Sequence, residues 1–263
     1  MNSEKEVNYL KVIACYKVIP LDDEISIRSD RSVCTDKAEL IVSPYDFNAI
    51  EAAVKIKESV DGVCVSVLTA GPGADDSKTR KAVLSRGADE MFGVNTGDIQ
   101  MLDSYASAVM LKAAIEKMGG ADLVICGEGS GDMYNQQVGN ILGQLMGCAV
   151  INGVCGIAAF EDHLVVERKL ESGAEEMEIK LPAVISVTSD VNLPRIANFK
   201  EIMAAGKKPF TVWSAKELGV SDCSGFEVVS ILAPEQTERK NMIFSGEDEE
   251  TVLKLFNEIR RLV

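Results

Sequence analysis

The 263-residue sequence has very few of the side chains that hydrolases and zinc enzymes use. Its single histidine, His163, stands beside a predicted turn. A Ser-His-Asp or Cys-His mechanism would have to use this residue, and nothing near it in the sequence suggests a nucleophile. One histidine also argues against a zinc site with histidine ligands. The sequence therefore offers no support for a hydrolase or transferase activity.

Cys-x-x-Cys pairs and long apolar runs are absent as well. Five of the seven cysteines lie in apolar runs, which is typical of reduced, buried thiols and not of a disulfide framework. No run approaches the ~18 apolar residues of a membrane span, and no apolar signal core follows the charged residues 1–7. We therefore expect a cytoplasmic protein with no integral membrane segment. The cysteines are Cys15, Cys34, Cys64, Cys126, Cys148, Cys155 and Cys223.

Positive charge is also scarce, since the formal net charge is −14. This balance argues against binding to nucleic acid or to an anionic membrane surface. It is compatible with a mononucleotide, which local backbone dipoles can hold. Hydrophobic residues make up 46% of the chain and charged residues 26%, which is typical of a soluble globular protein.

Short apolar runs alternate with amphipathic segments over the first 150 residues. The order β-α-β-α-β-α-β-α predicts a Rossmann-like α/β fold, with a parallel sheet and helices on both faces. Ser43 is expected to cap the first helix and Pro44 to occupy its first turn, while residues 20–40 look polar and irregular. The predicted strands cover 12–15, 63–68, 91–94 and 123–126, and the predicted helices begin near 44, 75, 103 and 140.

The second part of the chain has a different pattern. We expect an antiparallel hairpin at about 157–181 and a polar loop at about 188–208 with a short helix near 200–204. Buried strands are predicted at 182–187 and 210–213. The α/β domain then covers 1–213, and an extended C-terminal arm covers 214–263 and ends in a helix. The helix has an apolar stripe and either packs on its own domain or grips another subunit. The stripe contains Val252, Leu255, Phe256, Ile259 and Leu262.

A glycine-rich stretch at 127–139 follows one buried run and leads into a helix. It reads Gly-Glu-Gly-Ser-Gly-Asp-Met-Tyr-Asn-Gln-Gln-Val-Gly. In this geometry backbone N–H groups converge on an anion at the helix N-terminus, beyond the carboxyl ends of the strands. We expect Gly127, Gly129 and Gly131 to allow close approach of a phosphate and to adopt positive φ angles. The stretch lacks the Gly-Lys-Ser/Thr ending of a P-loop and is not a Gly-x-Gly-x-x-Gly turn. It suggests a nucleotide, and a plain tight turn is an equal alternative.

Several separated motifs make the chain resemble the β subunit of electron transfer flavoproteins along nearly its whole length. Within that family, the 127–139 stretch looks most like the branch linked to nitrogen fixation and to anaerobic carnitine or acyl-CoA reduction. The motifs are Ser-Pro-Tyr-Asp at 43–46 with Ala-Ile-Glu-Ala-Ala-Val at 49–54, Arg-Lys-Ala-Val-Leu-Ser-Arg-Gly-Ala-Asp at 80–89, Val-Glu-Arg at 166–168 with Leu-Pro-Ala-Val at 181–184, Asn-Leu-Pro-Arg-Ile at 192–196, and Ile-Met-Ala-Ala-Gly-Lys-Lys-Pro at 202–209.

The resemblance implies an electron carrier subunit and not an enzyme. Its α subunit partner would carry the electron-carrying FAD, and the C-terminal arm would pack on that subunit. The β subunit would hold a second nucleotide, which is AMP in ordinary members and a second FAD in members that bifurcate electrons. The complex would shuttle electrons between an acyl-CoA dehydrogenase-type protein, or another dehydrogenase or reductase, and a redox partner. The alternative is a stand-alone regulatory domain that binds an adenine nucleotide, but the hairpin, the 188–208 loop and the arm favour the electron carrier.

The resemblance also implies which residues meet the nucleotide. Asp132 is expected to shape the loop or cap the helix more than to touch phosphate, and Tyr45 and Tyr134 are as readily packing residues as ligand contacts. Glu128 and Gly129 depart from the Lys-Gln or Arg-Gln of the family, and a carboxylate beside phosphate is unfavourable unless it points away. The implied contacts are Cys15, Ser43, Pro44, Tyr45, Asp46, Ala70, Cys126, Gly127, Gly129, Ser130, Gly131, Asp132, Met133, Tyr134, Asn135, Gln136 and Gln137.

A docking loop for the dehydrogenase is implied at 191–200. Phe199 falls at the position of the apolar anchor, and Arg195 belongs to the same docking segment. Packing of Phe199 beneath the short helix is the competing interpretation.

Overall fold

The computed structural model describes residues 10–97, 102–220, 225–235 and 241–261. Its centre is a sheet of nine strands in the order β11-β10-β9-β12-β8-β1-β6-β7-β13. The strands from β9 to β13 in this order run parallel to one another, which confirms the predicted Rossmann-like α/β fold. The parallel strands are β1 (Leu10–Cys15), β6 (Val63–Ala70), β7 (Glu90–Asn95), β8 (Leu123–Gly127), β9 (Ala149–Ala159), β12 (Ala183–Val187) and β13 (Phe210–Ser214).

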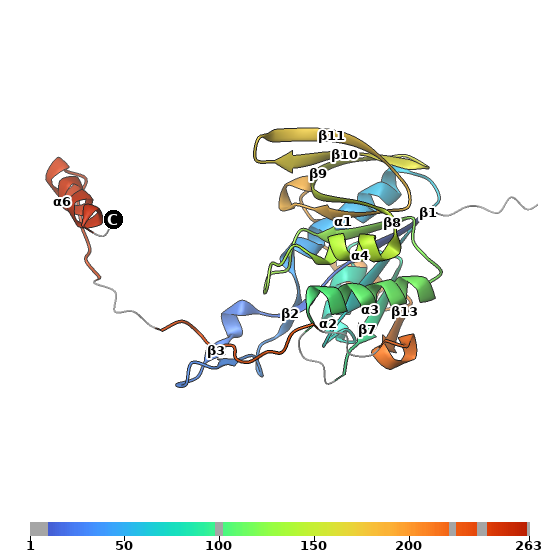
Figure 1. The fold of residues 1–263 in the computed structure, drawn as a ribbon, viewed down its shortest axis with the longest axis horizontal. Coiled ribbons are helices and arrows are strands. Elements are labelled where there is room, and N and C mark those ends of the chain that lie inside the picture. Colours follow the sequence, from blue (N-terminus) through green and yellow to red (C-terminus); the bar gives the residue numbers. More distant parts are fainter. Residues whose placement is uncertain (1–9, 98–101, 221–224, 236–240, 262–263) are drawn as a thin grey trace, which may run out of the picture. The chain divides into compact units, whose positions relative to one another are not determined.

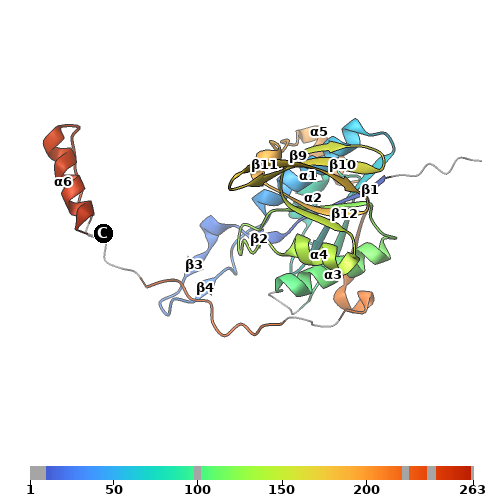
Figure 2. The ribbon, with the colours of Figure 1, turned by 45° about the horizontal axis from the view of Figure 1, so that its top comes forward.

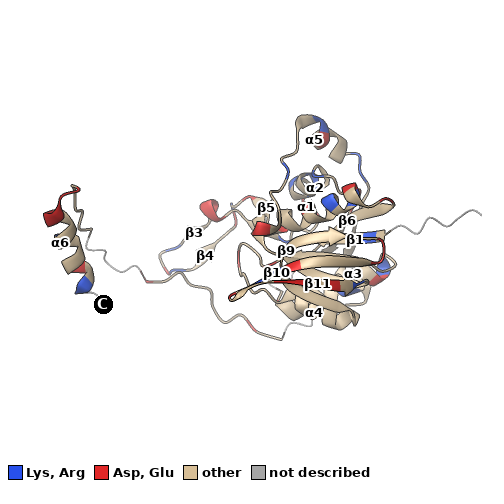
Figure 3. Cartoon of the chain, turned by 90° about the horizontal axis from the view of Figure 1, so that it is seen from above, with Lys and Arg blue, Asp and Glu red and all other residues tan. Residues whose placement is uncertain are grey.

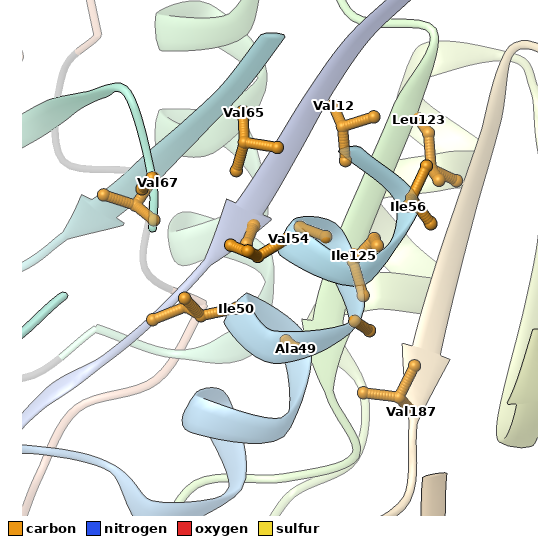
Figure 4. Close-up of a cluster of buried hydrophobic side chains, with 14 of the residues drawn as sticks. Val12, Ala49, Ile50, Val54, Ile56, Val65, Val67, Leu123, Ile125 and Val187 are labelled. Carbon is orange, nitrogen blue, oxygen red and sulfur yellow. The ribbon is translucent and has the colours of Figure 1, made fainter. Parts of the chain in front are cut away.

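Helices cover both faces of this sheet (Figures 1 and 2). Helices α1 (Pro44–Ser59) and α2 (Ser77–Leu84) pack on one face, and α3 (Ser104–Lys117) and α4 (Val138–Met146) pack on the other. The central strands are buried on both sides, so they read as continuous apolar runs. Figure 4 shows the cluster under α1, where Ile50 and Val54 meet Val12, Val65 and Ile125.

Two of the helix starts follow directly from the sequence. The Asp103 carboxylate accepts the Ala106 N–H at 2.6 Å and caps α3, which confirms the helix predicted to begin near 103. The Asp76 carboxylate accepts the Lys78 and Thr79 N–H groups in the same way and begins α2. Both carboxylates satisfy donors that a helix leaves unpaired in its first turn.

Strand β9 was not predicted from the sequence. It pairs in parallel with β12 and antiparallel with β10, so the hairpin continues the main sheet. Its register against β12 shifts by one residue near Gly153, which has φ +69°, and this interruption hides the strand pattern. The predicted antiparallel hairpin consists of β10 (His163–Leu170) and β11 (Gly173–Lys180). Strand β11 itself contains Glu175, Glu176 and Glu178, and Figure 3 shows acidic residues along this edge of the sheet.

Residues 20–40 are more regular than the sequence suggested. They include a short 3-10 helix at Asp22–Glu24 and the two-stranded sheet of β3 (Ser26–Ile27) and β4 (Val33–Cys34). A second small sheet pairs β2 (Val18–Pro20) with β5 (Leu40–Val42). Such short strands carry too few residues to show a period in the sequence, which explains the wrong expectation.

The chain divides into two compact units. One comprises 1–26 and 34–229, and the other comprises 27–33 and 230–263. In the second unit, the backbone at Ser32 bridges to Leu232, and Arg31 pairs with Glu235 at 3.0 Å.

Helix α6 (Glu249–Arg260) lies in the second unit and follows the Asp248 cap. No residue of α6 is buried, and its apolar side chains are about half exposed. The predicted stripe residue Leu262 and the cysteine Cys223 lie outside the described residues. Among the helices that the structure describes, none is long and apolar enough to cross a membrane.

Candidate functional site

A cleft opens at the carboxyl ends of β1, β6 and β8. Its volume of about 240 Å³ is an order of magnitude above the ~10–15 Å³ that one water needs, so it can hold a small organic molecule. Three connections meet there: the residues after Cys15, those after Ala70, and the 127–139 loop. The first turns of α3 form a further wall, with Leu102, Ser104 and Ser107.

Most of the residues implied by the family resemblance line this cleft. They are Cys15, Asp46, Ala70, Cys126, Gly127, Gly129, Ser130, Asp132, Met133, Asn135, Gln136 and Gln137. Ser43, Pro44, Tyr45, Gly131 and Tyr134 are not part of this lining, and the rings of Tyr45 and Tyr134 pack with centroids 5.1 Å apart. Contact of these residues with a nucleotide stays a prediction.

Several lining residues were missed by sequence reasoning. Lys17 stands two positions after β1, and only the fold brings its side chain to the glycine-rich loop. Ser186 lines the cleft from β12, directly opposite Cys126 in the strand register. The sequence predicted α3 as a helix but not as part of the cleft lining. The sequence showed only a candidate capping aspartate after a predicted strand. This does not reveal that the start of α3 lies beside the cleft.

Asp46 is buried and connects three segments around the cleft. Its carboxylate accepts the Lys17 N–H at 2.7 Å, and it also accepts the Gly127 N–H and the Ser43 hydroxyl. The Ser43 oxygen in turn accepts the Gly131 N–H at 3.2 Å. Ser43 occupies the predicted cap position of α1 but makes no capping bond, because its hydroxyl serves the loop instead. Asp46 and Ser43 therefore fasten the glycine-rich loop to the start of α1.

Burial raises the pKa of Asp46 to about 7, although the Lys17 N–H and the Ser43 hydroxyl stabilise its charged form. Burial therefore favours the protonated form of this carboxyl far more than an exposed position would. Its hydrogen bonds to the loop change with its charge, so the local structure of the cleft is linked to pH.

The glycines of the loop do not have the predicted conformation. None of Gly127, Gly129 and Gly131 has a positive φ angle. The two residues of this loop that do are Tyr134 at +47° and Gln136 at +57°. The glycines are needed for space instead. A Cβ on Gly127 would lie 2.5 Å from an Asp46 carboxylate oxygen, and one on Gly129 would lie 2.6 Å from the Tyr134 ring. The expectation of positive φ was wrong because close packing, not turn conformation, selects glycine here.

Glu128 and Lys17 set the charge near the loop. One Glu128 oxygen accepts the Ser189 N–H at 3.4 Å, so this carboxylate is engaged by the turn after β12. Burial and the nearby Glu128 carboxylate raise the pKa of the Tyr134 hydroxyl. The Lys17 ammonium lies 2.6 Å from Asp132, which places a cation at the cleft although the family's basic loop residue is replaced by Glu128.

The N-terminus of α4 faces the cleft through Gln137, Val138 and Gly139. The Gln137 side chain makes no capping hydrogen bond. First-turn N–H groups have no partner inside a helix, and the helix dipole favours an anion at this end. This arrangement fits a phosphate group.

The predicted docking loop is held against α1. Arg195 donates to the buried Glu51 from Nε at 2.7 Å and to Glu58 from Nη1 at 2.8 Å. Asn48 and Asn192 exchange amide hydrogen bonds beside this pair. The guanidinium of Arg195 is thus engaged within the chain, and a docking role for it stays a prediction.

Phe199 begins the short helix α5 (Phe199–Ala205) and is 79% exposed. It does not pack beneath α5 in this chain. Leu193 and Ile196 are even more exposed, and Met203 is also largely exposed. We call Leu193, Ile196, Phe199 and Met203 the loop patch.

A model of the electron transfer flavoprotein domain matches residues 31–218, which is well over half of the chain. The chain belongs to the electron transfer flavoprotein family. Proteins of this family carry electrons with the help of flavin and are not classical enzymes. The matched region includes Asp46, Ala70, the glycine-rich loop and the docking loop, and it ends within the first five residues of the arm. Within the parts that the structure describes, no three metal-ligating side chains come together, so a metal centre finds no ligand set there.

Proposed function

We propose that this chain is the β subunit of a heterodimeric electron transfer flavoprotein and binds an AMP moiety in the cleft. The moiety is AMP itself or the AMP half of a second FAD. The observation that carries the proposal is the glycine-rich loop, which leads from the end of β8 into the uncapped N-terminus of α4. Family membership supports it, because flavin and nucleotide binding fit a cleft at the carboxyl ends of parallel strands.

The lining of the cleft suits the parts of such a ligand. The N–H groups at the start of α4, the Ser130 hydroxyl and the Lys17 ammonium would hold the phosphate. The apolar side chains of Leu102, Leu111 and Val138 would cover the adenine or ribose. A flavin supplies one- or two-electron transfer when it is bound, and the residues of this chain bind and orient it.

The α subunit would carry the main FAD and pack against the exposed C-terminal arm. A dehydrogenase or reductase of the acyl-CoA or carnitine type, or one linked to nitrogen fixation, would dock at the loop patch. Exposed apolar side chains on a polar surface mark such interaction sites. We place the complex in the cytoplasm.

The decisive test is nucleotide counting. The chain is co-purified with an electron transfer flavoprotein α subunit, the complex is denatured, and released FAD and AMP are counted per heterodimer. One FAD and one AMP indicate a simple shuttle, whereas two FAD place a flavin on this chain and make electron bifurcation the working mechanism. Absence of both the complex and the second nucleotide would contradict the proposal, and it would favour the regulatory alternative only if the isolated chain still binds nucleotide.

Substitutions locate that nucleotide. Ala70→Leu places a larger side chain in the cleft and should remove the second nucleotide while the FAD of the α subunit stays bound. Ala158→Leu, on an exposed position of β9, is the matched control and should leave both in place. Equal nucleotide content in the two variants would show that the cleft is not the site.

The docking surface is tested separately. Phe199→Ala should slow electron transfer from the partner dehydrogenase without changing nucleotide content or thermal stability, since the side chain is 79% exposed. Phe160→Ala, at the exposed turn between β9 and β10, should have no such effect. Equal rates for both variants would exclude the loop patch as the docking site.

A further inference from the structure

Two cysteines lie next to each other at the carboxyl ends of neighbouring strands. In the parallel register of β1 and β8, Ala14 is opposite Ile125, so Cys15 and Cys126 are the next pair. Both cysteines belong to the apolar cluster that faces α3 and α4. Their thiols therefore project from the same face of the sheet.

This placement is within reach of a disulfide. Neighbouring strands lie about 4.7–4.9 Å apart, and a disulfide joins Cα atoms that are about 4.4–6.8 Å apart. The reduced thiols already interact, because Cys15 shares a side-chain hydrogen bond with Cys126.

Both thiols also border solvent. Cys15 and Cys126 each retain 6% exposure, and both line the cleft. The other described cysteines, Cys34, Cys64, Cys148 and Cys155, are not part of this lining. The thiol of Cys155, for example, donates to the Glu167 carbonyl on β10 at 3.5 Å.

The two thiols are not equivalent. The hydrogen bond with Cys126 and burial raise the pKa of Cys15 well above that of an ordinary thiol. Cys15 therefore keeps its proton and is the weaker nucleophile of the pair, which leaves Cys126 as the attacking sulfur. A thiolate at Cys126 would receive a hydrogen bond from the Cys15 thiol.

We propose that Cys15 and Cys126 are a reversible redox pair, which a small-molecule disulfide such as oxidised glutathione converts into a disulfide at the floor of the cleft. The Cys126 thiolate attacks one sulfur of the small disulfide, breaks its S–S bond and releases one small thiolate. The Cys15 sulfur then displaces the second small thiolate from Cys126. The two protein thiols lose two electrons and two protons, and the small disulfide gains them as two thiols.

Coupling of this pair to the ligand rests on the proposed function. A nucleotide over the floor of the cleft would cover both sulfur atoms and block the attacking disulfide. At a nucleotide concentration about ten times its Kd, the rate of oxidation should fall about tenfold, because only the empty fraction reacts.

The test uses the full chain, reduced and then freed of reductant. It is treated with oxidised glutathione, blocked with iodoacetamide and digested with trypsin and a protease that cuts after glutamate. The cuts after Lys11, Lys17 and Glu128 isolate Cys15 and Cys126 in separate peptides, away from Cys148 and Cys155. We expect these two peptides to be joined, and dithiothreitol to separate them.

Cysteine variants and added nucleotide distinguish the possible outcomes of this test. Cys15→Ser and Cys126→Ser should abolish the link, while Cys155→Ser should retain it. A wild-type chain that gains only glutathione on Cys126, or that forms no link, would overturn the redox pair and leave the proposed function untouched. A link that forms equally fast with saturating AMP or FAD would overturn its coupling to the cleft and count against nucleotide binding there, without affecting the disulfide itself.

Discussion

Single residues decide how the cleft is built, and Asp46 contributes most to it. Its buried carboxylate joins the residue after β1, the start of α1 and the start of the glycine-rich loop. A charged carboxylate in that position costs desolvation free energy, which its hydrogen bonds only partly offset. The free-energy cost of placing Asp46 at this position therefore depends on pH.

Asp46→Asn should change the pH dependence of stability. The folded-state pKa of about 7 lies above the ordinary value of 3.8, so the folded protein binds the proton more tightly than the unfolded chain does. Stability from this group is then full below about pH 4 and is lost as pH rises through about 7, with a total of roughly 4 kcal/mol. The asparagine variant lacks this loss. Its free energy of unfolding relative to wild type should therefore increase between pH 5 and 8, as measured by urea unfolding at several pH values. A difference that stays constant with pH would contradict the assignment.

Gly127→Ala tests whether the loop glycines serve packing. The new methyl group would press on the Asp46 carboxylate and on the Tyr45 carbonyl oxygen, which would lie 3.0 Å from the added Cβ. We expect a loss of about 1–3 kcal/mol in unfolding free energy and weaker nucleotide retention. Gly206→Ala is the matched control, since its Cβ would meet only the Met203 carbonyl at 3.6 Å, and it should change stability by no more than about 0.5 kcal/mol. Equal stability of the two variants would refute the packing explanation.

At the scale of elements, the docking loop is held on α1 by charge pairs and amide hydrogen bonds. The Glu51 side chain is only 5% exposed, and Arg195 donates to both of its oxygens. A short polar loop would otherwise be free to move, so this contact gives the loop patch a fixed platform. A fixed platform lowers the conformational entropy that a partner must remove on binding.

Arg195→Gln should release this loop. The buried Glu51 carboxylate would lose its cation, so we expect a loss of about 1–3 kcal/mol in stability and faster amide hydrogen exchange over 188–198. Adding Glu51→Gln to this variant should restore part of the stability, because the unpaired charge is then removed. Lys207→Gln, an exposed position after α5, is the control and should leave exchange unchanged. Unchanged exchange in Arg195→Gln would show that the ion pair does not hold the loop.

At the scale of the whole molecule, the apolar core belongs to one of the two compact units. Both buried clusters consist of residues in 1–26 and 34–229, whereas α6 in the other unit buries none of its residues. A helix with an exposed apolar face gains most of its stability from packing against another surface. The second unit is therefore suited to binding and adds little to the core.

A chain that ends at Val229 should keep its fold. Its melting temperature should stay within a few degrees of the full-length value, because the truncation removes no core residue. The same truncation should abolish co-purification with the α subunit. Differential scanning calorimetry and size-exclusion chromatography measure the two effects. A truncated chain that unfolds, or that still binds the α subunit, would contradict this division of roles.

The sequence determined the class of fold and the location of the ligand loop. Alternating apolar runs and capped helices specify a parallel α/β sheet, because these signals are local and depend on hydrogen bonds and burial within a few residues. Strand β9 escaped prediction, since a bulge near Gly153 interrupts its pattern.

Tertiary structure alone decided how the side chains of distant segments meet. It brought Lys17 to Asp132, Cys15 to Cys126, and the Ser43 hydroxyl to the Gly131 N–H. It also explains why residues 127 and 129 are glycines. A Cβ at either position would collide with the neighbouring Asp46 or Tyr134 side chain, and neither glycine has a positive φ angle. Contacts across the sheet depend on strand order and register, and neither is encoded in the local periodicity of the chain.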